Sequence, residues 1–202
     1  MSQELLDEIE QDCLQELVNL SYGKATAIIA KMLDAFATMR VPNISIISKD
    51  ELTQRLVDAV VPNQKSYLTI QVFKGEFAGE TLFFLGDASA TNLVKHLKES
   101  QENESVKDVV MELTNMATSS LVREFGKLLN TEVFFEEPAI YVSDGDKLFG
   151  ELEFSYDFVM LIDTVMEFKE QNIHGEVFIM MHEKTFKWLK ESLMEVVKKY
   201  YS

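Results

Sequence analysis

The feature that most constrains the fold is a set of residues that occurs twice, 96 positions apart. Identical pairs at this offset include Asp12 and Asp108, Glu16 and Glu112, Asn19 and Asn115, and Pro42 and Pro138. The same offset relates the apolar run 82–85 to the run 178–181. An ungapped shift of this kind is hard to reach by chance. The sequence therefore predicts two copies of one unit, at roughly 1–100 and 101–202.

Each unit has the same expected order of elements: a long helix, a strand, a hairpin and a closing helix. Helical periodicity runs through 4–38 and 105–130, after which Pro42 and Pro138 are expected to begin extended segments. A short helix is expected at 50–60, and the remaining elements follow in both halves. The expected strands are 44–47, 66–73, 80–85, 139–142, 158–168 and 176–181, and the expected closing helices are 88–99 and 184–200.

The two units are expected to form one domain, because no linker rich in Pro, Gly or Ser separates them. Only the polar stretch 98–104 lies between the halves. Half-size units without a linker are expected to share one sheet and one core. The sequence thus predicts an α+β fold over 1–202, an internally duplicated pseudo-two-fold unit. Its shared, mostly antiparallel sheet is expected to be flanked by the two long helices.

Charge and composition exclude several function classes. Asp and Glu number 34 against 19 Lys and Arg, which gives a net charge of −15. Such a surface repels nucleic-acid phosphates and anionic lipids and favours partners that present Lys or Arg. No apolar run approaches the ~20 residues of a membrane span, and the first residues do not form a signal peptide, so a cytoplasmic location is expected. The single cysteine, Cys13, and the three scattered histidines predict no metal site.

A polar stripe on each long helix is the candidate functional feature. At 100° per residue the members fall within about 60° of one another, opposite an apolar face. The stripe of the first helix is Asp12, Glu16, Asn19 and Gly23, and that of the second is Asp108, Glu112, Asn115 and Ser119. One such stripe alone is most often a solvated face. A duplicated structural unit would retain its core residues but would not need to retain an exposed Asn, so the repetition favours function.

These stripes carry a resemblance to a known family. The segments 16–23 (ELVNLSYG) and 111–115 (MELTN) resemble the active helices of the CheC-type chemotaxis phosphatases, which include CheC, CheX and the flagellar switch protein FliY. The resemblance extends over essentially the whole chain. Two copies of the motif within 202 residues are most similar to the arrangement in CheC.

The resemblance implies a hydrolase of two-component signalling. Its substrate would be the aspartyl phosphate of a CheY-like receiver domain in a response regulator. Glu16 and Glu112 would dock on the receiver's Lys, while Asn19 and Asn115 would position the attacking water. Supporting positions would be Asp12, Gly23, Pro42, Asp108 and Pro138. The receiver would supply Mg²⁺ from its own site, so the resemblance implies no metal or cofactor held by this chain. Family members also bind CheD, a receptor deamidase, which is a second candidate partner.

The sequence departs from the family pattern where Ser119 stands in place of a glycine equivalent to Gly23. A glycine there would ease the approach of a partner backbone, so the two sites are expected to differ in rate. Two other interpretations stay open. The chain could be a non-catalytic binding module of the same fold that sequesters a phosphorylated receiver or a CheD-like partner. It could also be a purely structural duplicated protein.

Overall fold

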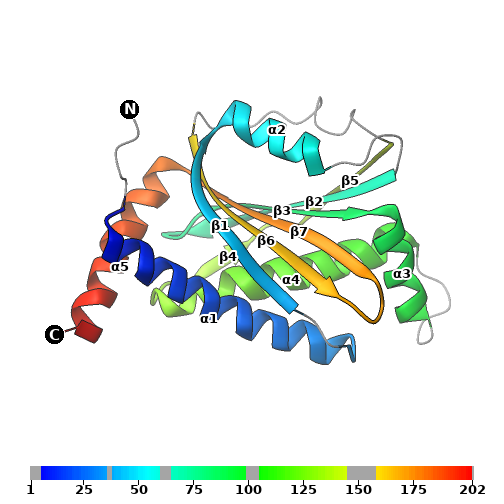
Figure 1. The fold of residues 1–202 in the computed structure, drawn as a ribbon, viewed down its shortest axis with the longest axis horizontal. Helices are drawn as coiled ribbons and strands as arrows, with labels where there is room; N and C mark the ends of the chain where they lie inside the picture. Colours follow the sequence, from blue (N-terminus) through cyan, green and yellow to red (C-terminus); the bar gives the residue numbers. More distant parts are fainter. Residues whose placement is uncertain (1–5, 36–37, 60–64, 99–104, 145–157, 202) are drawn as a thin grey trace.

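A single sheet of seven strands organises the computed structural model, which describes residues 6–35, 38–59, 65–98, 105–144 and 158–201 (Figure 1). The strand order is β1-β6-β7-β3-β2, and both β4 and β5 pair with the outer side of β2. Every described pairing is antiparallel. The strands are β1 (Thr38–Ser48), β2 (Lys65–Gly75), β3 (Gly79–Gly86), β4 (Val133–Phe135), β5 (Ala139–Asp144), β6 (Phe158–Phe168) and β7 (Ile173–Met181).

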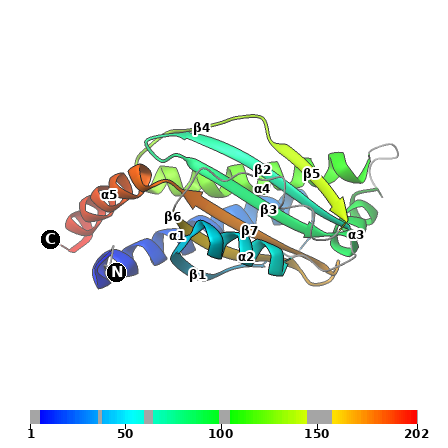
Figure 2. The ribbon, with the colours of Figure 1, turned by 90° about the horizontal axis from the view of Figure 1, so that it is seen from above.

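The five described helices cover the two faces of the sheet unequally. The helices are α1 (Glu8–Met32), α2 (Lys49–Ala59), α3 (Asp87–Lys98), α4 (Val106–Leu128) and α5 (Glu183–Tyr201). The long helices α1 and α4 pack against each other on one face, while α2 lies on the opposite face (Figures 1 and 2). The α+β class and the antiparallel sheet predicted from the sequence are confirmed, and the two long helices lie side by side on the same face of the sheet.

Two hydrophobic cores follow from this layering. The larger lies between the sheet and the helices α1, α3, α4 and α5, and it contains Leu14, Phe77, Val110, Leu121 and Leu189. The smaller lies under α2 and contains Leu52, Leu68, Leu82, Phe178 and Met180. The sheet is therefore apolar on both faces, which explains why its central strands are nearly continuous apolar runs in the sequence.

The first helix ends earlier than its periodicity predicts. It begins with a capping box, in which Asp7 accepts from the backbone N–H of Glu10 at 2.8 Å and Glu10 accepts from the backbone N–H of Asp7 at 2.8 Å. It ends at Met32 because Asp34 adopts a left-handed conformation, with φ of 45°. Short polar residues tolerate that conformation and so stop a helix. The expected helical stretch up to residue 38 is wrong, since 38 is the first residue of β1.

The two repeated prolines occupy different places in their strands. Pro42 lies inside β1, where the register against β6 shifts between Arg40 and Asn43. Such an irregularity in an edge strand accommodates a residue without an N–H. The prediction that Pro42 begins an extended segment is therefore wrong, whereas Pro138 directly precedes β5 as predicted. The short strand β4 has no counterpart among the sequence-based expectations.

The sheet register relates directly to the 96-residue offset. At the centre of the sheet β3 pairs antiparallel with β7, and Leu82 lies opposite Phe178, its own counterpart at that offset. The offset changes in one strand. Tyr67 pairs with Leu85 and Met160 pairs with Met181, so β6 corresponds to β2 at a separation of 93. The second hairpin is therefore three residues longer.

An internal duplication remains a prediction, which superposition of 1–100 on 101–202 would test. The counterpart of α2 would fall at 145–155, outside the described residues.

Candidate functional site

The stripe on α1 faces solvent along its whole length. Asp12, Glu16, Asn19 and Gly23 are all exposed. The Oδ1 atom of Asn19 accepts a hydrogen bond of 3.3 Å from the exposed amide of Gln15, one turn earlier on the same helix. Water can replace a partner at such an exposed contact, so the Asn19 amide is held only weakly in place.

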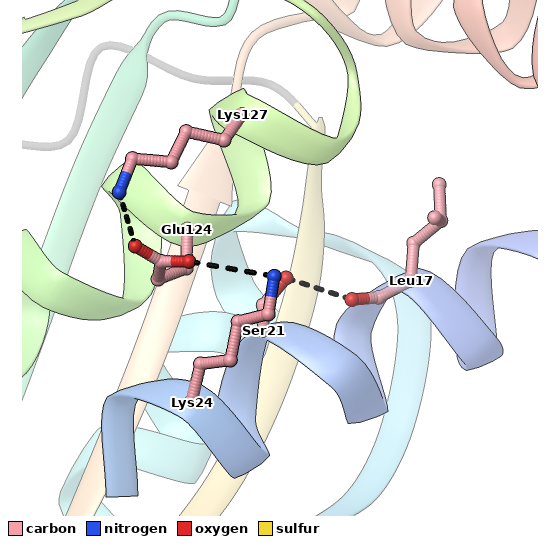
Figure 3. Close-up of polar contacts among 5 residues, drawn as sticks. All are labelled: Leu17, Ser21, Lys24, Glu124 and Lys127. Carbon is pink, nitrogen blue, oxygen red and sulfur yellow. Dashed lines mark hydrogen bonds and ion pairs between the residues drawn. The ribbon is translucent and has the colours of Figure 1, made fainter. Parts of the chain in front are cut away.

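The opposite face of α1 is buried, as the helical pattern predicts, with one exception. Leu14, Leu17, Val18, Ser21, Ala25 and Ile29 lie in the core, where the hydroxyl of Ser21 donates to the carbonyl of Leu17 at 2.7 Å (Figure 3). The exception is Ile28, which the 100° spacing places on this apolar face but which is 48% exposed. Leu20 is 45% exposed beside Asn19. The α1 stripe therefore presents apolar surface next to its Glu and Asn, which the polar pattern alone did not predict.

The stripe on α4 is only partly open. Asp108 and Glu112 are exposed, but Asn115 and Ser119 are half-buried. Asp108 lies in the first turn, where its backbone N–H donates to the hydroxyl of Ser105 and its carboxylate accepts from that hydroxyl at 2.6 Å. Asp108 thus helps to begin the helix, a role that its counterpart Asp12 does not share because α1 begins at Glu8.

Asn115 differs most from the sequence-based expectation of a fully exposed residue. Its Oδ1 atom accepts a hydrogen bond of 2.7 Å from Nε2 of Gln71, a buried residue of β2. The Oε1 atom of Gln71 accepts in turn from the hydroxyl of Thr118 at 2.7 Å. The Asn115 amide is therefore fixed from beneath by the sheet.

A second polar contact joins α4 to the same strand. The hydroxyls of Thr114 and Thr69 lie 2.9 Å apart, and both residues are buried. Sequence reasoning missed this network, yet it left a signal. Thr69 and Gln71 are two residues apart in an otherwise apolar strand, so they lie on one face of that strand. Thr114 and Thr118 are four residues apart on the apolar side of a helix, so they also share a face.

A buried carboxylate joins the two long helices (Figure 3). Glu124 of α4 is 9% exposed, and it pairs with Lys24 of α1 at 3.7 Å and with Lys127 one turn along α4. The hydrogen bond from Lys127, aided by the charges of both lysines, lowers the pKa of Glu124 despite the opposing effect of burial. Lys24 follows Gly23 directly, so this contact lies beside the end of the α1 stripe.

The other predicted positions are dispersed. Pro42 lies in β1 and Pro138 lies before β5, and neither belongs to a stripe. Gly23 lies on the α1 stripe, and a methyl group built there would meet nothing within 4 Å. The fold itself therefore does not require glycine at this position.

Within the described part of the chain, no three His, Cys, Asp or Glu side chains converge as metal ligands. His96 is half-buried and contacts the carbonyl of Leu33 at 2.7 Å, whereas His174 and His182 are exposed. Cys13 is half-buried, and burial raises the pKa of its thiol. Among the described helices, none has both the length and the apolar character needed to span a bilayer.

Solved structures share this fold. The model is similar to FliY from Thermotoga maritima, with a TM-score of 0.67 and 13% identity over 94% of this chain and 98% of that one. It is similar to the FliM middle domain from H. pylori, with a TM-score of 0.61 and 8% identity over 93% and 99% of the two chains. It is also similar to the chemotaxis protein CheX from Desulfovibrio desulfuricans, with a TM-score of 0.57 and 14% identity over 82% and 99%.

The sequence itself matches no family model and no curated protein. The fold inferred from the two stripes is thus confirmed by the fold of FliY and CheX, while the FliM middle domain shows that the same architecture is not confined to them.

Proposed function

We propose that this chain is a phosphatase that hydrolyses the aspartyl phosphate of a CheY-like receiver domain. The observation that carries the proposal is the repeated Glu–Asn pair, one turn apart on two adjacent helices, with Glu16, Asn19 and Glu112 exposed and Asn115 half-buried. The fold shared with FliY and CheX supports it. The pathway would be chemotaxis or another two-component circuit in the cytoplasm.

The carboxylates serve docking in this proposal. Glu16 and Glu112 are exposed and lie in a strongly acidic chain, so each can pair with a Lys that lines the active site of the receiver. Long-range attraction from the net charge of −15 would favour a partner with a basic active-site rim. The apolar surface of Leu20 adds contact area beside Glu16.

The amides serve the chemical step. The oxygen of a water molecule attacks the phosphorus, the bond from phosphorus to the receiver's carboxylate oxygen breaks, and inorganic phosphate leaves. The receiver supplies Lys and Mg²⁺, so the missing part is an aligned water. A neutral amide can both donate to and accept from that water. Asn19 lies one turn after Glu16 and can do both, whereas Asn115 lies one turn after Glu112 and can donate, because its Oδ1 already accepts from Gln71.

A binding module of the same fold is the second candidate. The FliM middle domain has this architecture, so the fold alone does not imply turnover. Such a module would sequester a phosphorylated receiver, or bind a CheD-like partner, without accelerating hydrolysis.

One experiment separates the two functions. Receivers from the source organism are phosphorylated individually, and phosphate release is followed with and without this protein at matched concentration. Faster decay of one receiver supports the phosphatase. Binding of a phosphorylated receiver without faster decay supports the binding module. A result with neither binding nor faster decay for any receiver contradicts the phosphatase and the sequestering module, and leaves only a module for a CheD-like partner.

A further inference from the structure

Gln71 is a buried polar residue whose side chain lies beneath the α4 stripe. It is 3% exposed, in the middle of β2, on the face of the sheet that α4 covers. Its side-chain amide contacts three groups: Oδ1 of Asn115 at 2.7 Å, the hydroxyl of Thr118 at 2.7 Å, and the carbonyl oxygen of Glu136 at 3.5 Å. A buried amide with this many partners has little rotational freedom.

The contact with Glu136 indicates which way the amide points. The atom of Gln71 that lies 3.5 Å from the carbonyl of Glu136, which only accepts, is Nε2. The same Nε2 then donates to Asn115, which leaves Oε1 to face the hydroxyl of Thr118. The reversed amide would place Oε1 of Gln71 beside the carbonyl oxygen of Glu136. In the observed arrangement Asn115 turns Oδ1 inward and Nδ2 outward.

We propose that Gln71 is a positioning residue for the α4 site, holding the Asn115 amide with its N–H groups toward the docked receiver. The inference rests on the proposed phosphatase function and deepens it. An N–H group that points outward can donate to one lone pair of the attacking water. The other lone pair of that water then stays free to attack phosphorus. Because the sheet fixes this orientation before the receiver binds, the ordering of the amide does not have to occur during turnover.

The first site lacks this support at the corresponding positions. The counterparts of Thr69, Thr114 and Thr118 are Ile162, Val18 and Tyr22, all buried, and the residue that corresponds to Gln71 is Thr164, which carries no amide. The hydrogen bond to Asn19 is an exposed contact from Gln15, on the same helix. The role of Gln71 is therefore specific to the α4 site.

Gln71→Met tests the assignment, because methionine has nearly the length of glutamine and removes only the polar contacts. The hydroxyl of Thr118 still has the carbonyl of Thr114 at 2.8 Å, so no buried donor loses its only partner. In an Asn19→Ala background, where only the α4 site works, Gln71→Met should lower kcat roughly tenfold to a hundredfold with little change in KM. In an Asn115→Ala background it should leave the rate unchanged.

Gln15→Met is the matched control, because it removes the amide that contacts Asn19 from an exposed position. In the Asn115→Ala background it should leave kcat nearly unchanged. An independent readout is the side-chain amide resonance of Asn115 in a ¹⁵N-labelled protein, which should shift in Gln71→Met and stay in place in Gln15→Met.

Several results would overturn the positioning role. An unchanged kcat in the Asn19→Ala background would do so, as would an equal loss in both backgrounds, a rise in KM alone or an unmoved Asn115 resonance. Each kinetic result is compared with a wild-type protein that accelerates decay of the receiver, and the resonance is compared with that of the wild-type protein. Failure of the wild-type protein itself to accelerate decay would instead contradict the proposed phosphatase.

Discussion

The stripes of α1 and α4 carry the same Asp, Glu and Asn at a constant separation, yet they lie in different surroundings. Asn19 is exposed next to Leu20 and contacts a neighbour on its own helix. Asn115 is half-buried and is held by Gln71 from the sheet. The layer beneath each helix makes the difference: α4 packs on β2 through Thr114, whereas α1 packs on β1. The same motif therefore leaves the Asn19 side chain free to reorient, whereas the Asn115 side chain is held by the sheet.

The largest effect should come from removing the two amides. Asn19→Ala or Asn115→Ala alone should leave the share of activity that belongs to the other site. The double variant should fall to the autodephosphorylation rate of the receiver, since the loss of one preorganised polar group costs roughly 10²–10³ in rate at each site. The measurement is decay of the phosphorylated receiver. A double variant as fast as wild type would remove the asparagines from the mechanism.

Charge reversal of the two glutamates should act mainly on docking. Glu16→Lys in the Asn115→Ala background, and Glu112→Lys in the Asn19→Ala background, should each raise KM by roughly 10- to 100-fold, because a lysine then faces the receiver's lysine. Salt should weaken docking of the wild-type protein, since exposed charges are screened over about 10 Å at 0.1 M. Unchanged KM in both variants would place the receiver elsewhere on the protein.

The starts of the two helices should differ in their contribution to stability. Glu10 and Asp108 are both the third residue of their helix. Glu10 is 2% exposed, accepts from the backbone of Asp7 and pairs with Lys190 of α5 at 3.2 Å, whereas Asp108 is exposed.

Glu10→Ala should therefore lower the free energy of unfolding by about 1.5–3 kcal/mol, because it removes the charge-assisted contacts of a buried carboxylate with the backbone of Asp7 and with Lys190. Asp108→Ala should cost only about 0.5–1 kcal/mol, as an exposed capping contact does. Denaturant unfolding of the two variants measures the difference. Equal losses would show that the junction of α1 with α5 is not stabilised by Glu10.

The sequence predicted the elements whose pattern is local. The two long helices, the two hairpins and the buried faces of α1 and α4 follow from periodicity, because each side chain's place depends on neighbours two to four residues away. The end of α1 did not follow, because it depends on the left-handed conformation of Asp34. Ile28 and Gln71 did not follow either, since their environments are set by residues far along the chain. Ile28 is exposed, while at its counterpart position Glu124 is buried between two lysines.

Acid should weaken the contact between helices α1 and α4 that Glu124 makes. Its pKa is lowered in the folded state, so the stabilisation is present above the ordinary Glu pKa of about 4.3 and is lost as pH falls through the lower folded value. Glu124→Gln should cost about 1 kcal/mol at pH 7 and should remove this part of the pH dependence. Unfolding of both proteins between pH 3 and pH 7 measures it. Parallel stability curves would show that Glu124 does not contribute through its charge.

The smallest effect is expected at position 23, where the α1 stripe has Gly23 and the α4 stripe has Ser119. A substitution there should show whether the fold or a docked receiver requires glycine. Gly23 lies in the interior of α1, and an added methyl group would meet nothing in the protein. Gly23→Ala should therefore stabilise the fold by about 0.5–1 kcal/mol, because alanine has the higher helix propensity.

If a receiver approaches the α1 stripe closely, the same methyl group should raise KM at that site, measured in the Asn115→Ala background. Ser119→Ala is the control on α4, where the position already carries a Cβ atom, and it should change KM little in the Asn19→Ala background. A Gly23→Ala protein that gains stability and keeps its KM would show that the receiver does not come close to α1 at this turn. The difference between glycine and serine would then be unrelated to any difference in rate between the two sites.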